Sequence, residues 1–151
     1  MDNVQNTNGM DCKLDGCLFF STNKLARELG RLAEEAFSKT GLSPSHAVLL
    51  YTVNLRGEIQ QKEIGELLHL TPSTITRLID KLERRGYIKK QLDGKSVCLW
   101  ATPEGLAQQE QIIASWNQLH EGYQNILTAE ETAQFLKISD KLLEHLTDKS
   151  E

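Results

Sequence analysis

Short polar side chains and cations are segregated along the segment from Thr71 to Arg84. The hydrogen-bonding side chains come first and most of the cations follow, in the order Ser73, Thr74, Thr76, Arg77, Lys81 and Arg84. Hydroxyl and guanidinium groups pair with the exposed edges of DNA bases, whereas ammonium and guanidinium groups bind phosphates. On one helix, this order predicts base contacts from the N-terminal half and phosphate contacts from the later residues.

The same segment has the pattern of an amphipathic helix. Its apolar residues recur at helical spacing, as Ile75, Leu78, Ile79 and Leu82. Thr71 is suited to cap the helix, Pro72 is tolerated in its first turn, and Gly86 is expected to end it. Alone, such a helix also fits an ordinary solvated surface, so the neighbouring elements decide between the two interpretations.

A second helix and a hairpin flank this segment. Residues 60–68 predict a short helix, and His69-Leu70-Thr71 supplies the tight connection of a helix-turn-helix. Beyond Gly86, β-prone runs over 87–92 and 95–100 surround Asp93-Gly94, a strong signal for a two-residue hairpin turn. The whole arrangement predicts a winged helix-turn-helix, with Lys95 beside the hairpin tip as a further phosphate-binding residue.

Long amphipathic helices are predicted on both sides of this unit. Apolar residues recur at helical spacing over about 17–39, 44–56, 103–127 and 129–146. The terminal helices carry more apolar surface than a winged helix can cover, so we expect them to pair in a two-fold dimer; a bundle within one chain is the alternative. The predicted fold class is mainly α, a winged helix-turn-helix with a small β-hairpin wing and long N- and C-terminal dimerisation helices.

These elements divide the 151 residues into a tail at 1–14, expected to be disordered, and a single domain at 15–147. Within that domain, the predicted reading head covers about 44–101, and the predicted dimerisation helices cover 15–40 and 103–147. Charge follows the same division: the chain carries −4 overall, but residues 71–100 carry +4 and residues 101–151 carry −6. The basic charge is concentrated where phosphates are expected to bind.

The composition argues against several other classes of protein. No segment reaches the roughly 18–20 continuous apolar residues of a membrane span, and the N-terminus lacks the pattern of a signal peptide. The three cysteines lack metal-ligand spacing. The four histidines occupy separate predicted elements, and there is no glycine-rich phosphate loop, which argues against an enzyme. We therefore expect a cytoplasmic protein without catalytic residues, metal or cofactor.

From about residue 15 to residue 147, the order of helices resembles that of the multiple-antibiotic-resistance regulator (MarR) family. The resemblance rests on TPSTITRLIDKLERRGYI at 71–88 and ATPEG at 101–105. It implies a homodimeric winged-helix repressor that leaves a palindromic DNA operator when a small molecule or oxidant acts near the junction of dimer helices and reading head. A small phenolic or other apolar molecule is the expected effector, and His46 is a candidate contact for it.

The predicted hairpin departs from the family pattern. The family usually carries an acidic-plus-double-arginine motif at this tip, and its arginine enters the minor groove. Here the tip is shorter and Lys95 stands in place of that arginine. Because lysine gains less than arginine from a narrow minor groove, we expect the wing to bind phosphate more than it reads sequence.

Cys17 lies where the peroxide-sensing branch of the family carries its reactive cysteine, at the start of the first helix. A helix N-terminus stabilises a thiolate, which is the form that peroxides oxidise. That branch holds its cysteine with tyrosine hydroxyls, whereas here Ser21 lies one turn later and the first tyrosine is Tyr51. Two interpretations remain open: a redox-active Cys17, with Cys12 as its resolving thiol, or a structural cysteine. Cys98 is expected to pack within its strand.

Three functions fit this sequence. The first is a homodimeric DNA-binding repressor that a small-molecule effector releases from its operator. The second is a regulator of the same kind that senses oxidants through Cys17. The third is a winged-helix protein-interaction module that does not bind DNA, and a steep loss of DNA affinity with salt would exclude it.

Overall fold

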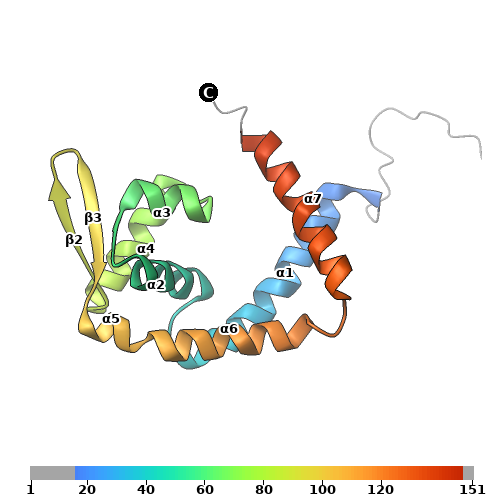
Figure 1. Ribbon diagram of the computed structural model, residues 1–151, viewed down its shortest axis with the longest axis horizontal. Helices are drawn as coiled ribbons and strands as arrows, with labels where there is room; N and C mark the ends of the chain where they lie inside the picture. The colour runs from blue at the N-terminus through green and yellow to red at the C-terminus, as the bar shows by residue number, and fades with distance from the viewer. Residues whose placement is uncertain (1–15, 148–151) are drawn as a thin grey trace, which may run out of the picture.

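The computed structural model describes residues 16–147, and its order of elements is that of a winged helix flanked by longer helices (Figure 1). The helices are α1 (Leu18–Phe37), η2 (Ser38–Thr40), α2 (Pro44–Arg56), α3 (Gln61–Leu68), α4 (Pro72–Arg84), α5 (Pro103–Ala107), α6 (Gln109–Tyr123) and α7 (Ala129–Thr147). The strands are β1 (Glu58–Gln60), β2 (Ile88–Asp93) and β3 (Ser96–Ala101). The mainly helical fold class is confirmed, whereas the tail predicted at 1–14 lies outside the described residues.

Side-chain caps fix where several helices begin. Ser43, Thr71 and Thr102 each precede a proline and accept a hydrogen bond from a backbone N–H in the following turn. Before α7, Thr128 and Glu131 form a reciprocal capping box, with N···O distances of 3.1 and 2.8 Å. These starts were all predicted from the sequence, because a cap and a first-turn proline act locally.

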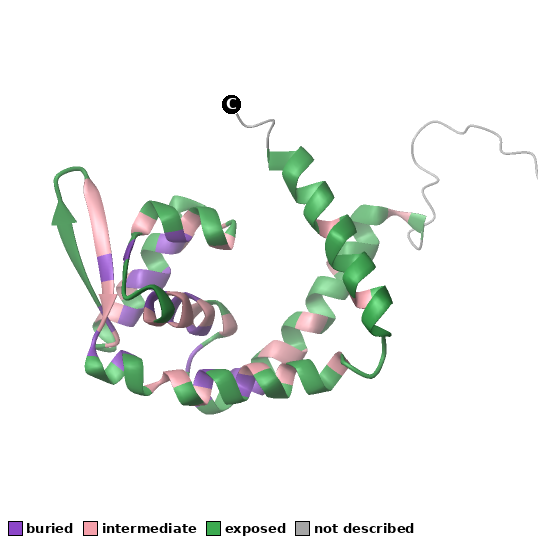
Figure 2. Ribbon diagram, in the orientation of Figure 1, coloured by how far each residue is buried: buried purple, intermediate pink, exposed green. Residues whose placement is uncertain are grey.

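The hydrophobic core centres on the reading head, where buried residues concentrate on α2 and α4, and it extends to the end of α1 and to α6 (Figure 2). Its largest fully buried side chains include Leu49, Leu50, Ile64, Ile79, Leu82 and Leu99. The sheet has the order β1-β3-β2 and is antiparallel throughout. Strands β2 and β3 form the wing, in which Lys90 pairs with Leu99 and Leu92 pairs with Val97. The core therefore joins the wing and the helix-turn-helix into one unit.

Strand β1 was not predicted from the sequence. It contains three residues, and Glu58 pairs with Trp100 near the end of β3, away from the hairpin turn. A strand this short has no periodicity of its own, and its partner lies about forty residues away in the chain. The strand ties the start of α3 to the wing.

The single long helix predicted after the hairpin is wrong, because the chain forms two helices there, α5 and α6. The carbonyl of Gly105 accepts from the Gln108 N–H at 3.2 Å and from the Asn54 amide at 3.1 Å. The same Asn54 amide also donates to the Gln109 side chain at 2.8 Å. These contacts break the regular pattern of backbone bonds and turn the chain. Leu106, Ile113 and Ile126, which were predicted to face inward, are exposed.

The terminal helices extend away from the reading head. Helix α6 runs from the base of the wing toward α7 and packs against α1 (Figure 1). Helix α7 leaves the end of α6 and has no buried residue along its 19 positions. Between residues 16 and 147, the structure contains no helix that is long and apolar enough to cross a membrane.

Candidate nucleic-acid interface

The helix-turn-helix is formed by α3 and α4. Its turn begins at His69, which has a φ of 50° and caps α3 in the left-handed conformation. The Leu70 N–H then donates to the Gly65 carbonyl at 3.1 Å, closing the end of α3. Helix α4 buries all four residues of its predicted apolar face, Ile75, Leu78, Ile79 and Leu82. Its opposite face is thereby held outward.

The structure brings together four of the seven predicted DNA-binding residues around one surface pocket. This pocket has a volume of about 380 Å³, and its polar lining residues are His46, Thr74, Arg77, Asp80, Lys81 and Arg84. Arg77, Lys81 and Arg84 are exposed on α4. Ser73 is also exposed, but its hydroxyl lies 3.3 Å from the Thr71 hydroxyl at the helix start. The polar face of α4 is thus continuous from its N-terminus to its last turn.

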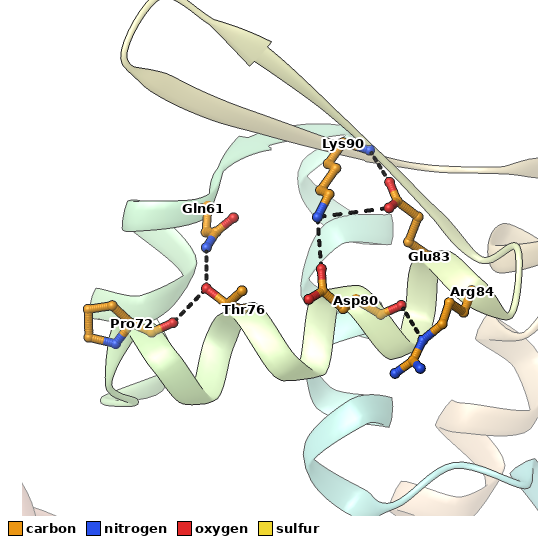
Figure 3. Close-up of polar contacts among 7 residues, drawn as sticks. All are labelled: Gln61, Pro72, Thr76, Asp80, Glu83, Arg84 and Lys90. Carbon is orange, nitrogen blue, oxygen red and sulfur yellow. Dashed lines mark hydrogen bonds and ion pairs between the residues drawn. The ribbon is translucent and has the colours of Figure 1, made fainter.

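Thr76 is held by a residue that the sequence analysis missed. Its hydroxyl donates to the Pro72 carbonyl at 2.9 Å and accepts from the Gln61 amide at 3.1 Å (Figure 3). Gln61 is the first residue of α3 and lies fifteen positions earlier in the chain. No sequence spacing relates the two residues, because the crossing of α3 and α4 brings them together. Gln61 therefore places an amide-bearing side chain beside the polar face of α4.

An ion-pair network joins the wing to α4. The Lys90 ammonium lies 2.7 Å from an Asp80 carboxylate oxygen and 3.9 Å from Glu83, and the Lys90 N–H donates to Glu83 at 3.3 Å (Figure 3). The hydrogen bond to Asp80 is the largest cause that raises the pKa of Lys90, and the charges of Asp80 and Glu83 add to it. This network was not predicted. It holds the wing at a fixed place relative to α4.

Arg84 and Lys95 occupy different surroundings. The Arg84 guanidinium turns back along its helix and donates to the Asp80 carbonyl at 3.3 Å (Figure 3). Lys95 is exposed in the hairpin turn itself, which is Gly94-Lys95 and not the predicted Asp93-Gly94, because Asp93 pairs with Ser96 at the ends of the two strands. Gly94 has a φ of 64°. It borders a second pocket of about 590 Å³, between the wing and α3, together with Lys62. Lys95 is therefore separate from the cluster of cations on α4.

His46 and the cysteines lie apart from one another. His46 is half-buried at the start of α2 and lines a pocket together with residues of α4. Cys17 occupies the N-cap position of α1, as predicted, and is partly buried. Cys98 is partly buried on β3, where burial and then the nearby carboxylates of Glu58 and Asp93 raise its pKa. The raised pKa keeps the Cys98 thiol protonated. Cys12 lies outside the described residues.

This arrangement defines a class of protein. A helix-turn-helix with a buried inner face, a cationic outer face and an adjoining basic wing is the architecture of winged-helix DNA-binding proteins. The sequence model of the MarR family matches residues 42–94, which run from the loop before α2 to the turn of the wing. Over 111 residues, the chain is 29% identical to the HTH-type transcriptional repressor MdtR of Bacillus subtilis, covering 72% of each chain. The chain is also 32% identical over 97 residues to the HTH-type transcriptional regulator YwhA of Bacillus subtilis, covering 62% of this chain and 70% of that protein. The protein belongs to the MarR family.

Solved structures share the fold. A mutant of MarR from E. coli in complex with operator DNA has a TM-score of 0.75 at 22% identity, covering 83% of this chain and 93% of that chain. CouR from Rhodococcus jostii, bound to p-coumaroyl-CoA, has a TM-score of 0.76 at 21% identity, covering 85% and 93%. Family membership and the named relatives make this protein a DNA-binding transcription regulator and not an enzyme.

Proposed function

We propose that the protein is a cytoplasmic homodimer that represses transcription from a palindromic operator and is released by a small-molecule effector. The observation that carries the dimer is the uncovered apolar face of α7. Phe135, Ile138 and Leu146 are 49, 61 and 70% exposed, although they lie on one face of a well-capped helix. A contiguous apolar face of this kind marks an interaction surface.

A second copy of the chain is the occupant that fits this face. On α1, Leu18 and Leu25 are 65 and 42% exposed, so the first and the last helix both carry uncovered apolar residues. Burying one leucine or isoleucine side chain stabilises an assembly by about 1.5–3 kcal/mol. A two-fold dimer buries each such residue twice and gives two reading heads for two half-sites.

The exposed face of α4 supplies the proposed contacts to double-stranded DNA. Ser73, Thr74, Thr76 and Arg77 are assigned to base edges, and Lys81, Arg84 and Lys95 are assigned to phosphates. The contacts described above refine these roles. Thr76 acts with Gln61, whereas the Arg84 guanidinium bonds the Asp80 carbonyl through Nε and keeps its terminal N–H groups for a phosphate.

Effector release is proposed to act where α1, α2 and α6 meet. Three aromatic residues meet there: Phe37 from α1, Tyr51 from α2 and Trp116 from α6. The Trp116 ring centroid lies 6.0 Å from that of Phe37 and 6.1 Å from that of Tyr51. A flat phenolic or other apolar molecule that entered this cluster would shift α2 of the reading head together with the dimerisation helices α1 and α6. The names of MdtR, a repressor, and of the CouR complex with p-coumaroyl-CoA support a ligand-responsive repressor.

The dimer is tested by the molar mass in solution and by binding to DNA. The double variant Ile138→Glu/Leu142→Glu places charges on the apolar face of α7, and it should yield monomer or aggregate with weak operator binding. The matched control, Lys137→Glu/Lys141→Glu, reverses charges on the polar face and should remain dimeric. Light scattering coupled to gel filtration measures both. A soluble dimer from the first variant would contradict the proposed interface.

The signal is tested on a complex with DNA from upstream of the gene. Salicylate serves as a phenolic probe, and an organic peroxide serves as the oxidant. Release by salicylate supports the effector switch. Release by peroxide that fails in Cys17→Ser would instead support the redox-sensing alternative, and release by neither would contradict both of these signals.

A further inference from the structure

The pocket between α2 and α4 has the chemistry of an anion site. Two of its lining residues, Lys81 and Arg84, are permanent cations already assigned to phosphates. Arg77, assigned to base edges, adds a third positive charge, and His46 also lines the pocket. A volume of about 380 Å³ holds a phosphodiester together with its water. Since α4 also forms the proposed DNA-binding face, a backbone phosphate of bound DNA is the anion that reaches this pocket.

Ser43 holds the His46 ring in place in either protonation state. The Ser43 hydroxyl oxygen lies 2.5 Å from the ring Nδ1 and accepts from the His46 N–H at 3.4 Å. When the ring is neutral, the hydroxyl donates to Nδ1. When the ring is protonated, Nδ1–H donates to the same oxygen. Protonation therefore requires only a rotation of the hydroxyl and leaves the ring facing α4.

The charged groups that face His46 come from α4 and its C-cap. Partial burial lowers the pKa of His46 below its ordinary value of 6.5, and the charges of Lys81 and then Arg85 lower it further. The Arg85 guanidinium lies near the loop before α2, 3.4 Å from where a Cβ on Gly41 would stand. The pocket also contains Asp80, Arg77 and Arg84, and the Asp80 carboxylate is paired with Lys90. Near pH 7, the ring is therefore neutral in the free protein.

We propose that His46 takes up a proton when a DNA phosphate enters this pocket, so that DNA affinity rises as the pH falls. This inference rests on the proposed DNA-binding face. A phosphate offsets the charges of Lys81 and Arg85 and gives the ring an anionic partner. Both effects favour the imidazolium. No permanent cation on α4 has this property, because lysine and arginine stay charged across the neutral range.

The sign of the effect follows from the two pKa values of His46. The pKa lies below 6.5 in the free protein, and the phosphate raises it in the complex. Above the pKa of the complex, neither state is protonated and DNA affinity does not depend on pH. As the pH falls between the two values, affinity rises by up to about tenfold per pH unit for each histidine that binds a proton. Below the pKa of the free protein, affinity is constant again.

The test measures DNA affinity by fluorescence anisotropy between pH 5.5 and 8.5 at constant ionic strength. The probe is a labelled duplex from upstream of the gene, and a scrambled duplex of equal length is measured beside it. The full-length protein should bind both more tightly at low pH, because phosphates are common to both. His46→Gln should bind with a flat profile near the high-pH affinity of the parent protein. His46→Lys should bind tightly at every pH.

The control variant is His120→Gln on α6, which should retain the pH profile of the parent protein. The ring proton of His46, followed by NMR, should titrate at a higher pH in the complex than in the free protein. A parent protein that binds DNA with a flat profile, or a His46→Gln variant with the parent slope, would overturn the proton linkage while leaving DNA binding intact. Failure of the parent protein to bind either duplex at any pH would overturn the proposed DNA-binding face itself.

Discussion

Gly105→Ala is expected to destabilise the protein where the wing connects to α6. A Cβ on residue 105 would lie 2.1 Å from the Tyr87 carbonyl oxygen and 2.9 Å from its carbon. Non-bonded carbon atoms pack at about 3.5–4.0 Å, so the two backbone segments have to separate by roughly 1 Å. Because Gly105 is buried, the added methyl group cannot move into solvent to relieve the clash.

The separation would also disturb the hydrogen bonds that close this junction. The Thr102 N–H donates to the Tyr87 carbonyl at 3.0 Å. The Thr102 hydroxyl donates to the Gly86 carbonyl at 2.5 Å and accepts from the Gly105 N–H at 3.1 Å. Overpacking costs about 1–3 kcal/mol, and leaving one buried polar group unpaired costs about 1–3 kcal/mol more. We therefore expect a loss of roughly 2–6 kcal/mol in the free energy of unfolding.

Urea unfolding followed by circular dichroism measures this loss, at one fixed protein concentration because the proposed dimer couples unfolding to association. Gly122→Ala is the matched control. Its Cβ would lie 3.9 Å from the Leu32 methyl groups, an ordinary contact, and alanine favours a helix over glycine by up to about 1 kcal/mol. The control should be as stable as the parent protein or more stable. A Gly105→Ala variant within about 0.5 kcal/mol of the parent protein would refute the reasoning.

Three further outcomes are expected. Arg77→Ala should cost about 1–3 kcal/mol of operator binding and weaken the preference over a scrambled duplex in anisotropy titrations; an unchanged preference would contradict base contact. Lys90→Gln should change the free energy of unfolding by less than about 1 kcal/mol, because the pair with Asp80 is partly exposed, yet it should lower DNA affinity and speed hydrogen exchange in the wing. Thr128→Ala should cost about 0.5–2 kcal/mol of stability in urea titrations, since the Glu131 N–H loses its acceptor, and no loss would show that the cap is not needed.

The features that the sequence predicted well are those set by neighbouring residues. A cap followed by proline fixes the starts of α2, α4 and α5 within one turn. The hairpin is likewise predicted, but its turn is Gly94-Lys95 and not Asp93-Gly94, because Asp93 pairs with Ser96 as the last residue of β2. Glycine accepts the positive φ found at position 94. The apolar spacing of α4 predicts its buried face for the same reason. In each case the cause and its effect lie within about one helical turn of each other.

The features that the sequence missed depend on contacts between distant segments. Strand β1 exists because Glu58 and Ile59 meet the end of β3. The break before α6 exists because Asn54, on α2, bonds the Gly105 carbonyl. Likewise, neither the Gln61–Thr76 bond nor the Asp80–Lys90 pair follows from spacing within one helix. Local sequence pattern therefore could not predict that Gln61 and Lys90 contact residues of α4 beside the proposed DNA-binding residues.

The contacts within the reading head bear on how the protein can respond to a signal. Lys90 ties the wing to α4, and Thr102 ties the base of the wing to the start of α5. Changing the shape of the DNA-binding face would require breaking these contacts together with the core beneath them. Helix α7, by contrast, buries none of its residues within the described chain. A ligand at the Trp116 cluster is therefore expected to change the spacing of two heads, whereas a proton on His46 acts on each head where it meets DNA. The two inputs should combine additively in DNA affinity, because they act through separate contacts.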